Sequence, residues 1–73
     1  MQVFIRHTNT LIFEFNYTDT IATVKNTYYQ KTGIPSKHIV LNYNGKLLKD
    51  AEPISKYIID TDATIHMDIK MSV

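Results

Sequence analysis

The sequence predicts an α+β fold in which a mixed β-sheet wraps one main helix. Apolar residues alternate with polar residues near both ends of the chain, which is the period of a half-buried β-strand. In a central segment they recur at spacings of three and four, which is the period of an amphipathic helix. The chain has 73 residues, a length that builds one hydrophobic core and leaves no room for a separate catalytic domain. We therefore expect residues 1–73 to form a single domain.

The first predicted element is a β-hairpin within residues 1–17, which are rich in β-branched and aromatic side chains. Its two strands flank the polar stretch His7–Asn9, where Asn9 is expected to adopt the left-handed backbone that a three-residue loop needs. We expect Ile5 to lie opposite Leu11 on the face that points to the core.

A helix is predicted between Thr20 and Gly33. Asp19 and Thr20 offer an N-cap, because a short side-chain oxygen accepts a hydrogen bond from a free amide of the first turn. Gly33 supplies the left-handed residue that ends a helix, and Pro35 cannot continue it. The stripe expected to face the core consists of Ile21, Val24 and Tyr28.

A second hairpin is predicted around Asn44-Gly45, because both central residues of a two-residue type I′ turn need positive φ. The strand before the turn covers residues 39–43, and a short strand after it covers residues 46–48. The polar segment Lys49–Asp60 is predicted to be a loop with at most a short helical turn near Ser55–Ile58.

The closing strand is predicted over residues 64–70, where Ile65, Met67 and Ile69 alternate with polar residues and share one buried face. The chain thus runs through hairpin, helix, strand, tight turn, short strand, loop and closing strand. A mixed five-stranded sheet that wraps the helix, the β-grasp arrangement, buries the apolar stripes of all these elements together.

Composition excludes several classes of function. The chain has no cysteine, so it has no disulfide framework and no thiolate ligands, which fits a reducing intracellular compartment. A formal net charge of +1 without a basic run predicts no nucleic-acid partner, and the short apolar runs predict no membrane span. The three histidines are dispersed, without a carboxylate at ligand spacing. We expect no metal, no cofactor and no enzymatic activity.

Residues spread over the whole chain fall in the order and nearly the spacing of the ubiquitin family. They are Met1–Ile5, Asp19–Ile21, Val24-Lys25, Gly33–Pro35, Gly45-Lys46, Asp50, Tyr57 and Thr64–His66. The resemblance implies a ubiquitin-like β-grasp fold. It also implies one of two functions, either a covalent modifier that is joined through a C-terminal Gly-Gly or an unconjugated domain that recruits partner proteins.

The chain departs from the modifier pattern at its C-terminus. Val73 stands where the resemblance places the first glycine of the pair, and Lys70 and Ser72 stand where paired arginines are expected. Conjugation needs a slim tail that threads a narrow enzyme channel, where a Cβ would clash. We therefore expect an unconjugated domain.

A second departure concerns the exposed apolar patch that the resemblance implies on the sheet. The matching positions here are Asn42, His66 and Asp68, so two aliphatic anchors have become polar. Each lost anchor would be worth about 1.5–3 kcal/mol at an interface, and we expect ordinary ubiquitin-binding modules to bind poorly. Val40 and Leu47 flank this region. Together with Asn42, His66 and Lys70, these two residues form either a more polar binding site or a simply solvated face.

The hairpin register also places Phe4 opposite Ile12 on the outer face of the sheet. Such an exposed pair indicates either a partner surface or a cross-strand contact that only stabilises the hairpin. Because aliphatic anchors are lost elsewhere on this face, we predict that partner binding has moved to Phe4 and Ile12. Arg6 and His66 would supply the polar rim of that surface.

The resemblance implies structural roles for three further residues. Lys25 and Asp50 match positions that pair beneath the helix, and breaking a fully buried pair would cost about 3–5 kcal/mol. Tyr57 matches a tyrosine whose ring covers the loop that contains it and whose hydroxyl bonds to the backbone near Lys49.

These observations predict a monomeric domain for noncovalent protein–protein interaction, acting as a module of a larger protein in the cytoplasm, the nucleus or both. The expected partners are proteins of the ubiquitin–proteasome pathway or a related one. The alternatives are a covalent modifier whose Gly-Gly tail is absent from this chain, and a ubiquitin mimic.

Overall fold

The computed structural model describes residues 1–58 and 62–70. The strands and the main helix are, in chain order, β1 (Gln2–Arg6), β2 (Thr10–Glu14), α1 (Ile21–Thr32), β3 (Ile39–Tyr43), β4 (Lys46–Leu47) and β5 (Ala63–Ile69). Short 3₁₀ helices cover Ser36–His38 and Ile54–Lys56.

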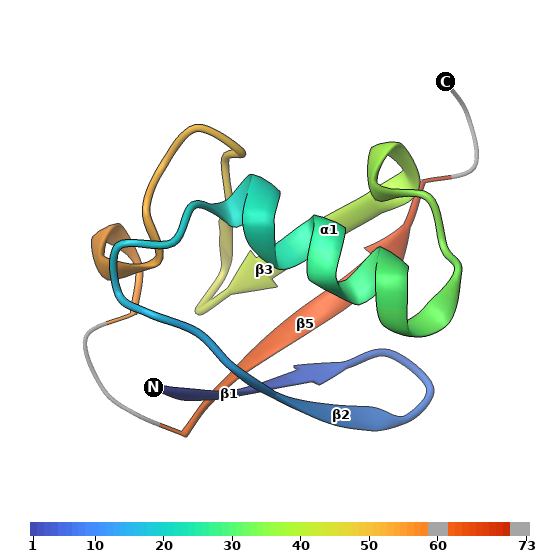
Figure 1. Ribbon diagram of the computed structural model, residues 1–73, viewed down its shortest axis with the longest axis horizontal. Coiled ribbons are helices and arrows are strands. Elements are labelled where there is room, and N and C mark those ends of the chain that lie inside the picture. Colours follow the sequence, from blue (N-terminus) through green and yellow to red (C-terminus); the bar gives the residue numbers. More distant parts are fainter. Residues whose placement is uncertain (59–61, 71–73) are drawn as a thin grey trace.

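The five strands form one mixed sheet in the order β2-β1-β5-β3-β4. β1 and β5 run parallel, and the other neighbouring pairs are antiparallel. The helix α1 crosses one face of this sheet, so that the other face is left open (Figure 1). The predicted α+β fold, a mixed five-stranded sheet that wraps one main helix, is confirmed.

The first hairpin has the predicted register, with Ile5 opposite Leu11. The expectation for Asn9 is wrong, because in the described part of the chain only Asn44 and Asp62 among non-glycine residues have positive φ. Instead, the His7 N–H donates a hydrogen bond to the Asn9 carbonyl over 3.1 Å. This bond continues the pairing of β1 with β2 into the loop, so the chain reverses without a left-handed residue at this position.

Local signals in the sequence place the ends of α1 and the second turn correctly. Thr20 caps the helix by accepting a hydrogen bond from the Thr23 N–H over 3.3 Å, and Gly33 ends it with φ 81°. In the second hairpin Asn44 has φ 55° and Gly45 has φ 80°, the two positive values that the predicted tight turn needs.

The core lies between α1 and the inner face of the sheet. Its buried side chains are Val3, Ile5, Phe13, Phe15, Ile21, Val24, Tyr28, Ile39, Leu41, Leu48, Ile54, Ile58, Ala63, Ile65 and Met67. The segment predicted as a polar loop thus contributes two fully buried isoleucines. Its helical turn covers Ile54–Lys56, slightly earlier than predicted, and residues 59 and 60 of that segment lie outside the described residues.

The sequence predicts Ile69 on the buried face of the last strand, but this residue is 37% exposed. It lies opposite Ile39 at the end of β5, where the cover that α1 gives to the inner face has ended (Figure 1). Alternation along the strand is kept, and only the depth of burial differs from the prediction.

Candidate functional site

A row of side chains crosses the open face of the sheet from β1 to β4. Arg6 lies opposite His66, His66 lies opposite Asn42, and Asn42 lies opposite Leu47. Residues directly opposite each other on neighbouring strands point to the same face and are close enough for their side chains to interact. The parallel pairing of β1 with β5 thus places Arg6 next to His66. His66 is one of the three positions, with Asn42 and Asp68, that match the exposed patch implied by the resemblance, here called the family's usual patch.

An apolar pair lies beside this row. Phe4 is opposite Ile12 on β2 and opposite Thr64 on β5. Ile12 is 60% exposed, and Phe4 is partly exposed. Phe4 and Ile12 lie on the same face as Arg6, because Arg6 follows Phe4 by two residues along β1.

The hydrogen-bond pattern brings Phe4 and Ile12 especially close. Met1 and Phe15 bond to each other in both directions, over 2.6 and 2.9 Å. Hydrogen-bonded and non-hydrogen-bonded pairs alternate along an antiparallel ladder, so Phe4 and Ile12 form a non-hydrogen-bonded pair, in which opposite side chains are closer.

The remaining predicted residues lie on the other side of the row. Val40 is opposite Asp68, so the carboxylate of Asp68 stands next to Val40 and two residues from His66 on the same face. The structure therefore brings all eight predicted binding residues to one face, with the apolar pair at one corner and the polar side chains across its middle. Within residues 1–58 and 62–70, neither Arg6 nor Asp68 forms an ion pair.

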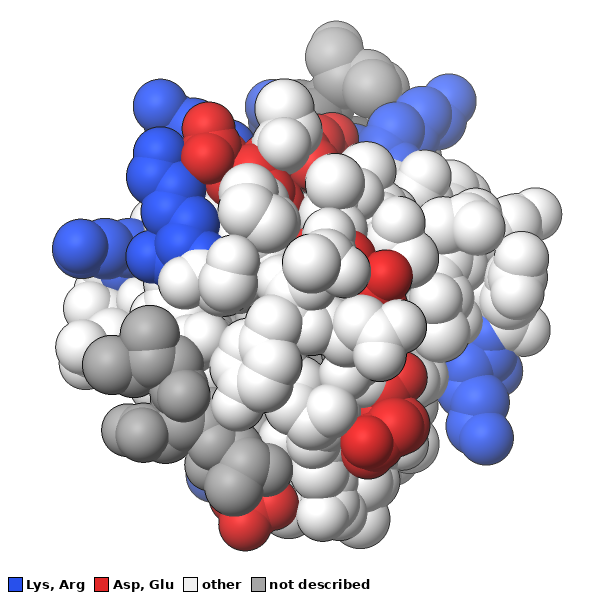
Figure 2. Space-filling view, turned by 60° about the vertical axis from the view of Figure 1, so that its left-hand side comes forward, with Lys and Arg blue, Asp and Glu red and all other residues white. Residues whose placement is uncertain are grey.

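Charges of both signs are interspersed on the molecule. On the side drawn in Figure 2, basic and acidic side chains lie next to one another at the upper border, and the middle of the view is largely uncharged. With a formal net charge of +1, this distribution gives no large field of a single sign on this side, so a partner there would be recognised mainly by short-range contacts.

Lys25 and Asp50 are in contact. Lys25 Nζ lies 2.6 Å from Asp50 Oδ1, with the lysine side chain 14% exposed and the aspartate side chain 64% exposed. The Ala22 N–H also donates to the Asp50 carbonyl over 3.1 Å. The contact joins α1 to the loop after β4, but water reaches the carboxylate, so removing it should cost less than breaking a fully buried pair.

Tyr57 packs against the core, and the Lys49 N–H donates to its hydroxyl over 3.2 Å. We predict that Tyr57→Phe lowers the free energy of unfolding by about 1 kcal/mol, the typical net value of one hydrogen bond. Urea denaturation followed by circular dichroism measures the loss. Tyr17→Phe, at a tyrosine that is 42% exposed, is the matched control and should be neutral. Equal midpoints for both variants would mean that the Tyr57 hydroxyl is simply solvated.

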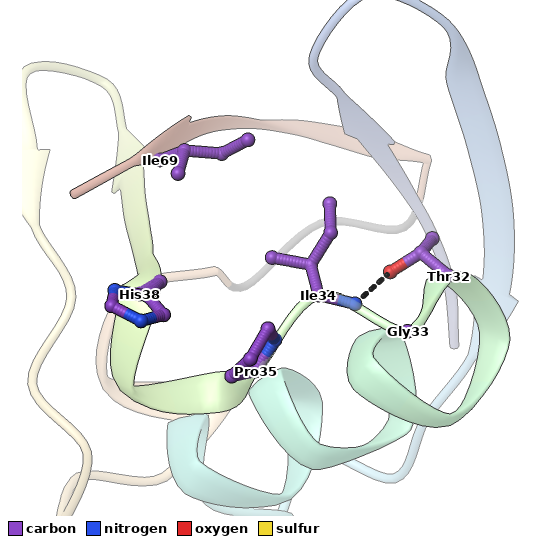
Figure 3. Close-up of a pocket in the computed structure, with 6 residues that line it drawn as sticks. All are labelled: Thr32, Gly33, Ile34, Pro35, His38 and Ile69. Atoms are coloured by element: carbon purple, nitrogen blue, oxygen red, sulfur yellow. Dashed lines mark hydrogen bonds between the residues drawn. The ribbon is translucent and has the colours of Figure 1, made fainter. Parts of the chain in front are cut away.

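A pocket of about 350 Å³ lies between the end of α1 and the end of β5, and sequence analysis did not predict it. It is lined by Thr32, Gly33, Ile34, Pro35, His38 and Ile69 (Figure 3). Ile34 and Ile69 supply apolar surface, and the His38 ring is fixed by a 2.8 Å bond between Nδ1 and the Lys70 carbonyl. The pocket could hold one apolar side chain, and its only signal in the sequence is the isoleucine at the end of β5.

The part of the chain that the structure describes contains no group of three His, Cys, Asp or Glu side chains that could hold a metal ion. Burial raises the pKa of the Tyr28 hydroxyl above its usual value, because desolvation disfavours the phenolate. Tyr28 packs on Phe13 with 5.9 Å between ring centroids, so this tyrosine is a neutral core residue.

The described helices include none that is long and apolar enough to cross a membrane.

Comparison with known proteins identifies the family. Human Ubiquitin D is 33% identical over 61 residues, which cover 84% of this chain and 37% of that protein. Mouse Splicing factor 3A subunit 1 is 30% identical over 60 residues, which cover 82% of this chain and 8% of that protein. The chain thus spans less than half of the length of either relative. The profile described as "Ubiquitin family" matches residues 3–72, and the chain therefore belongs to the ubiquitin family.

Proposed function

We propose that this chain is a noncovalent protein-interaction domain whose binding surface is the Phe4–Ile12 corner of the open sheet face. The observation that carries the proposal is the exposed Phe4–Ile12 pair beside the row that Arg6 and His66 begin. An apolar centre with a polar rim is the usual composition of a small specific interface. Asn42 and Asp68 leave the family's usual patch without the two aliphatic anchors that the resemblance implies.

The surroundings of this corner support the assignment. Ile12 is 60% exposed, although polar residues normally occupy the solvent face of an antiparallel strand. Arg6 forms no ion pair among the described residues, so its guanidinium can bind a partner carboxylate or carbonyl. The surface therefore suits a partner that presents an apolar side chain next to a hydrogen-bond acceptor.

We propose that the domain acts as part of a larger protein, with partners in the ubiquitin–proteasome pathway or a related one, and that it carries no enzymatic activity itself. The match to a small fraction of Splicing factor 3A subunit 1 fits the use of such a domain as a module. A splicing factor among the relatives also fits a nuclear location, within the broader proposal of cytoplasm, nucleus or both.

Affinity capture from a cell extract, with the wild-type domain and its variants as bait, tests the proposed surface. The wild-type domain should retain a partner from extract that Phe4→Ala loses and Asn42→Ala keeps. Retention that depends on Asn42 and not on Phe4 would return the binding surface to the family's usual patch.

Covalent conjugation is the competing function, and it depends on Val73, which lies outside the described residues. We predict that this 73-residue chain forms no thioester with ubiquitin-activating enzyme, because its tail lacks the glycines that a narrow channel admits. Ubiquitin serves as the positive control, and Val73→Gly with one glycine appended tests the tail alone. A thioester on the unaltered chain would support the modifier function instead.

A further inference from the structure

The two borders of the sheet differ in how they are protected. β4, at one border, has only two residues, and very short edge strands are one of the ways in which proteins prevent pairing between sheets. β2, at the other border, has five residues. It runs along the margin of the sheet in Figure 1 with no other strand beyond it.

The hydrogen-bond pattern shows which groups of β2 are free. At the two ends of the hairpin, Met1 and Phe15 exchange two hydrogen bonds, and the His7 N–H donates one to the Asn9 carbonyl. Bonded pairs alternate along an antiparallel ladder, so every second residue of β2, starting from Leu11, bonds to β1. The N–H and C=O groups of Thr10, Ile12 and Glu14 therefore point to the open border.

β2 also lacks the usual protection of an edge strand. Its sequence, TLIFE, contains no lysine and no proline, and its one-to-one register with β1 shows no bulge. Its single charge, on Glu14, lies 3.1 Å from the N-terminal amino group. A β-prone, nearly uncharged edge strand is a template for pairing with another strand.

We propose that β2 pairs with β2 of a second copy of this chain, antiparallel, about a two-fold axis at Ile12. In this register Ile12 lies opposite Ile12 of the second copy, and Thr10 lies opposite Glu14 of the second copy. All the free backbone groups of Thr10, Ile12 and Glu14 are then paired at once, because each of these residues falls in a hydrogen-bonded pair. The two sheets become one continuous sheet with both helices on the same side.

The composition of the strand favours a second copy over a foreign peptide. The register is self-complementary, with no like charges opposite each other, and the net charge of +1 opposes association only weakly. Both strands are already ordered by their hairpins, so pairing avoids the ordering cost that an extended peptide pays.

On the inner face of the sheet, there is also space beside β2 for side chains of the second copy. Phe13, Thr27, Gln30 and Lys31 line a groove of about 310 Å³ between β2 and α1. In the proposed register Phe13 lies opposite Leu11 of the second copy, whose side chain is only partly buried against its own core and borders this groove. On the outer face, Ile12 of each copy lies opposite Ile12 of the other. The two Phe4–Ile12 pairs therefore form one continuous apolar strip.

This proposal differs from the monomer expected from the sequence, and it does not rest on the proposed function. Strand pairing uses the border of the sheet, so the outer surface of Phe4 stays available to other proteins.

Sedimentation equilibrium of the purified chain tests the proposal. Between about 10 μM and 1 mM, the range suited to a weak interface, the mean mass should rise from monomer toward dimer. Ile12→Lys should raise the dissociation constant about tenfold or more, because two lysines would face each other across the axis. Leu47→Lys is the matched control, since Leu47 is also 60% exposed but lies on the opposite border, and it should leave the constant unchanged.

Amide hydrogen exchange locates the contact. Protection of the Thr10, Ile12 and Glu14 amides should increase with protein concentration, because their N–H groups bond only in the dimer. A monomer throughout the concentration range would overturn the proposal. A dimer that Leu47→Lys weakens and Ile12→Lys does not would place the interface on the other border and would equally overturn it.

Discussion

Phe4→Ala should lower the affinity of the domain for its partner about 30-fold, which corresponds to the roughly 2 kcal/mol that an aromatic hot spot carries. The reason lies in the position of Phe4, which shares an exposed apolar corner with Ile12 and is the one aromatic side chain among the eight predicted binding residues. Truncation removes the bulkiest apolar side chain among these eight residues. Isothermal titration calorimetry with the captured partner measures the change.

Two controls make this result specific. Leu47→Ala removes an equally exposed aliphatic residue at the far border of the same face, and Asn42→Ala alters the family's usual patch. Both should change the affinity less than about threefold, as expected for residues outside a hot spot. Because Phe4 also stabilises the hairpin through its cross-strand contact, the denaturation midpoint of Phe4→Ala must show that the variant is folded at the temperature of the titration.

Asp50→Ala should lower the free energy of unfolding by about 1–2 kcal/mol, less than for a fully buried pair because the aspartate is 64% exposed. The loss arises at Lys25, whose side chain is only 14% exposed and whose ammonium would remain without its partner. Urea denaturation of the wild type and the variant measures it.

A second variant separates the stranded charge from lost packing. Lys25→Met keeps an apolar stem of similar length and removes the charge, so Lys25→Met combined with Asp50→Ala should regain most of the stability lost in Asp50→Ala. An unchanged midpoint for Asp50→Ala alone would show that water already screens the pair.

Much of the fold is predictable because its signals are local. The Asn44-Gly45 turn and the caps at Thr20 and Gly33 each depend on the backbone preference of one or two residues. The buried positions of Ile54 and Ile58 are different, because their segment has no regular period. It is held by tertiary bonds such as that from the Ile54 N–H to the Asp19 carbonyl, 2.8 Å long.

The candidate face is predictable only in part. Alternation along each strand assigns Phe4, Arg6 and His66 to the outer face, but it does not say which strands are neighbours. Their grouping depends on the parallel pairing of β1 with β5, which joins segments about sixty residues apart and leaves no mark on local spacing. Only the resemblance to the ubiquitin family implies that these strands are neighbours in the sheet.

The most direct test of the proposed surface is NMR chemical-shift mapping of the domain titrated with its partner. We expect the largest perturbations to centre on Phe4 and Ile12 and to extend to Arg6 and His66. Perturbations centred on Asn42 and Asp68, with Phe4 and Ile12 unchanged, would contradict it and place binding at the family's usual patch.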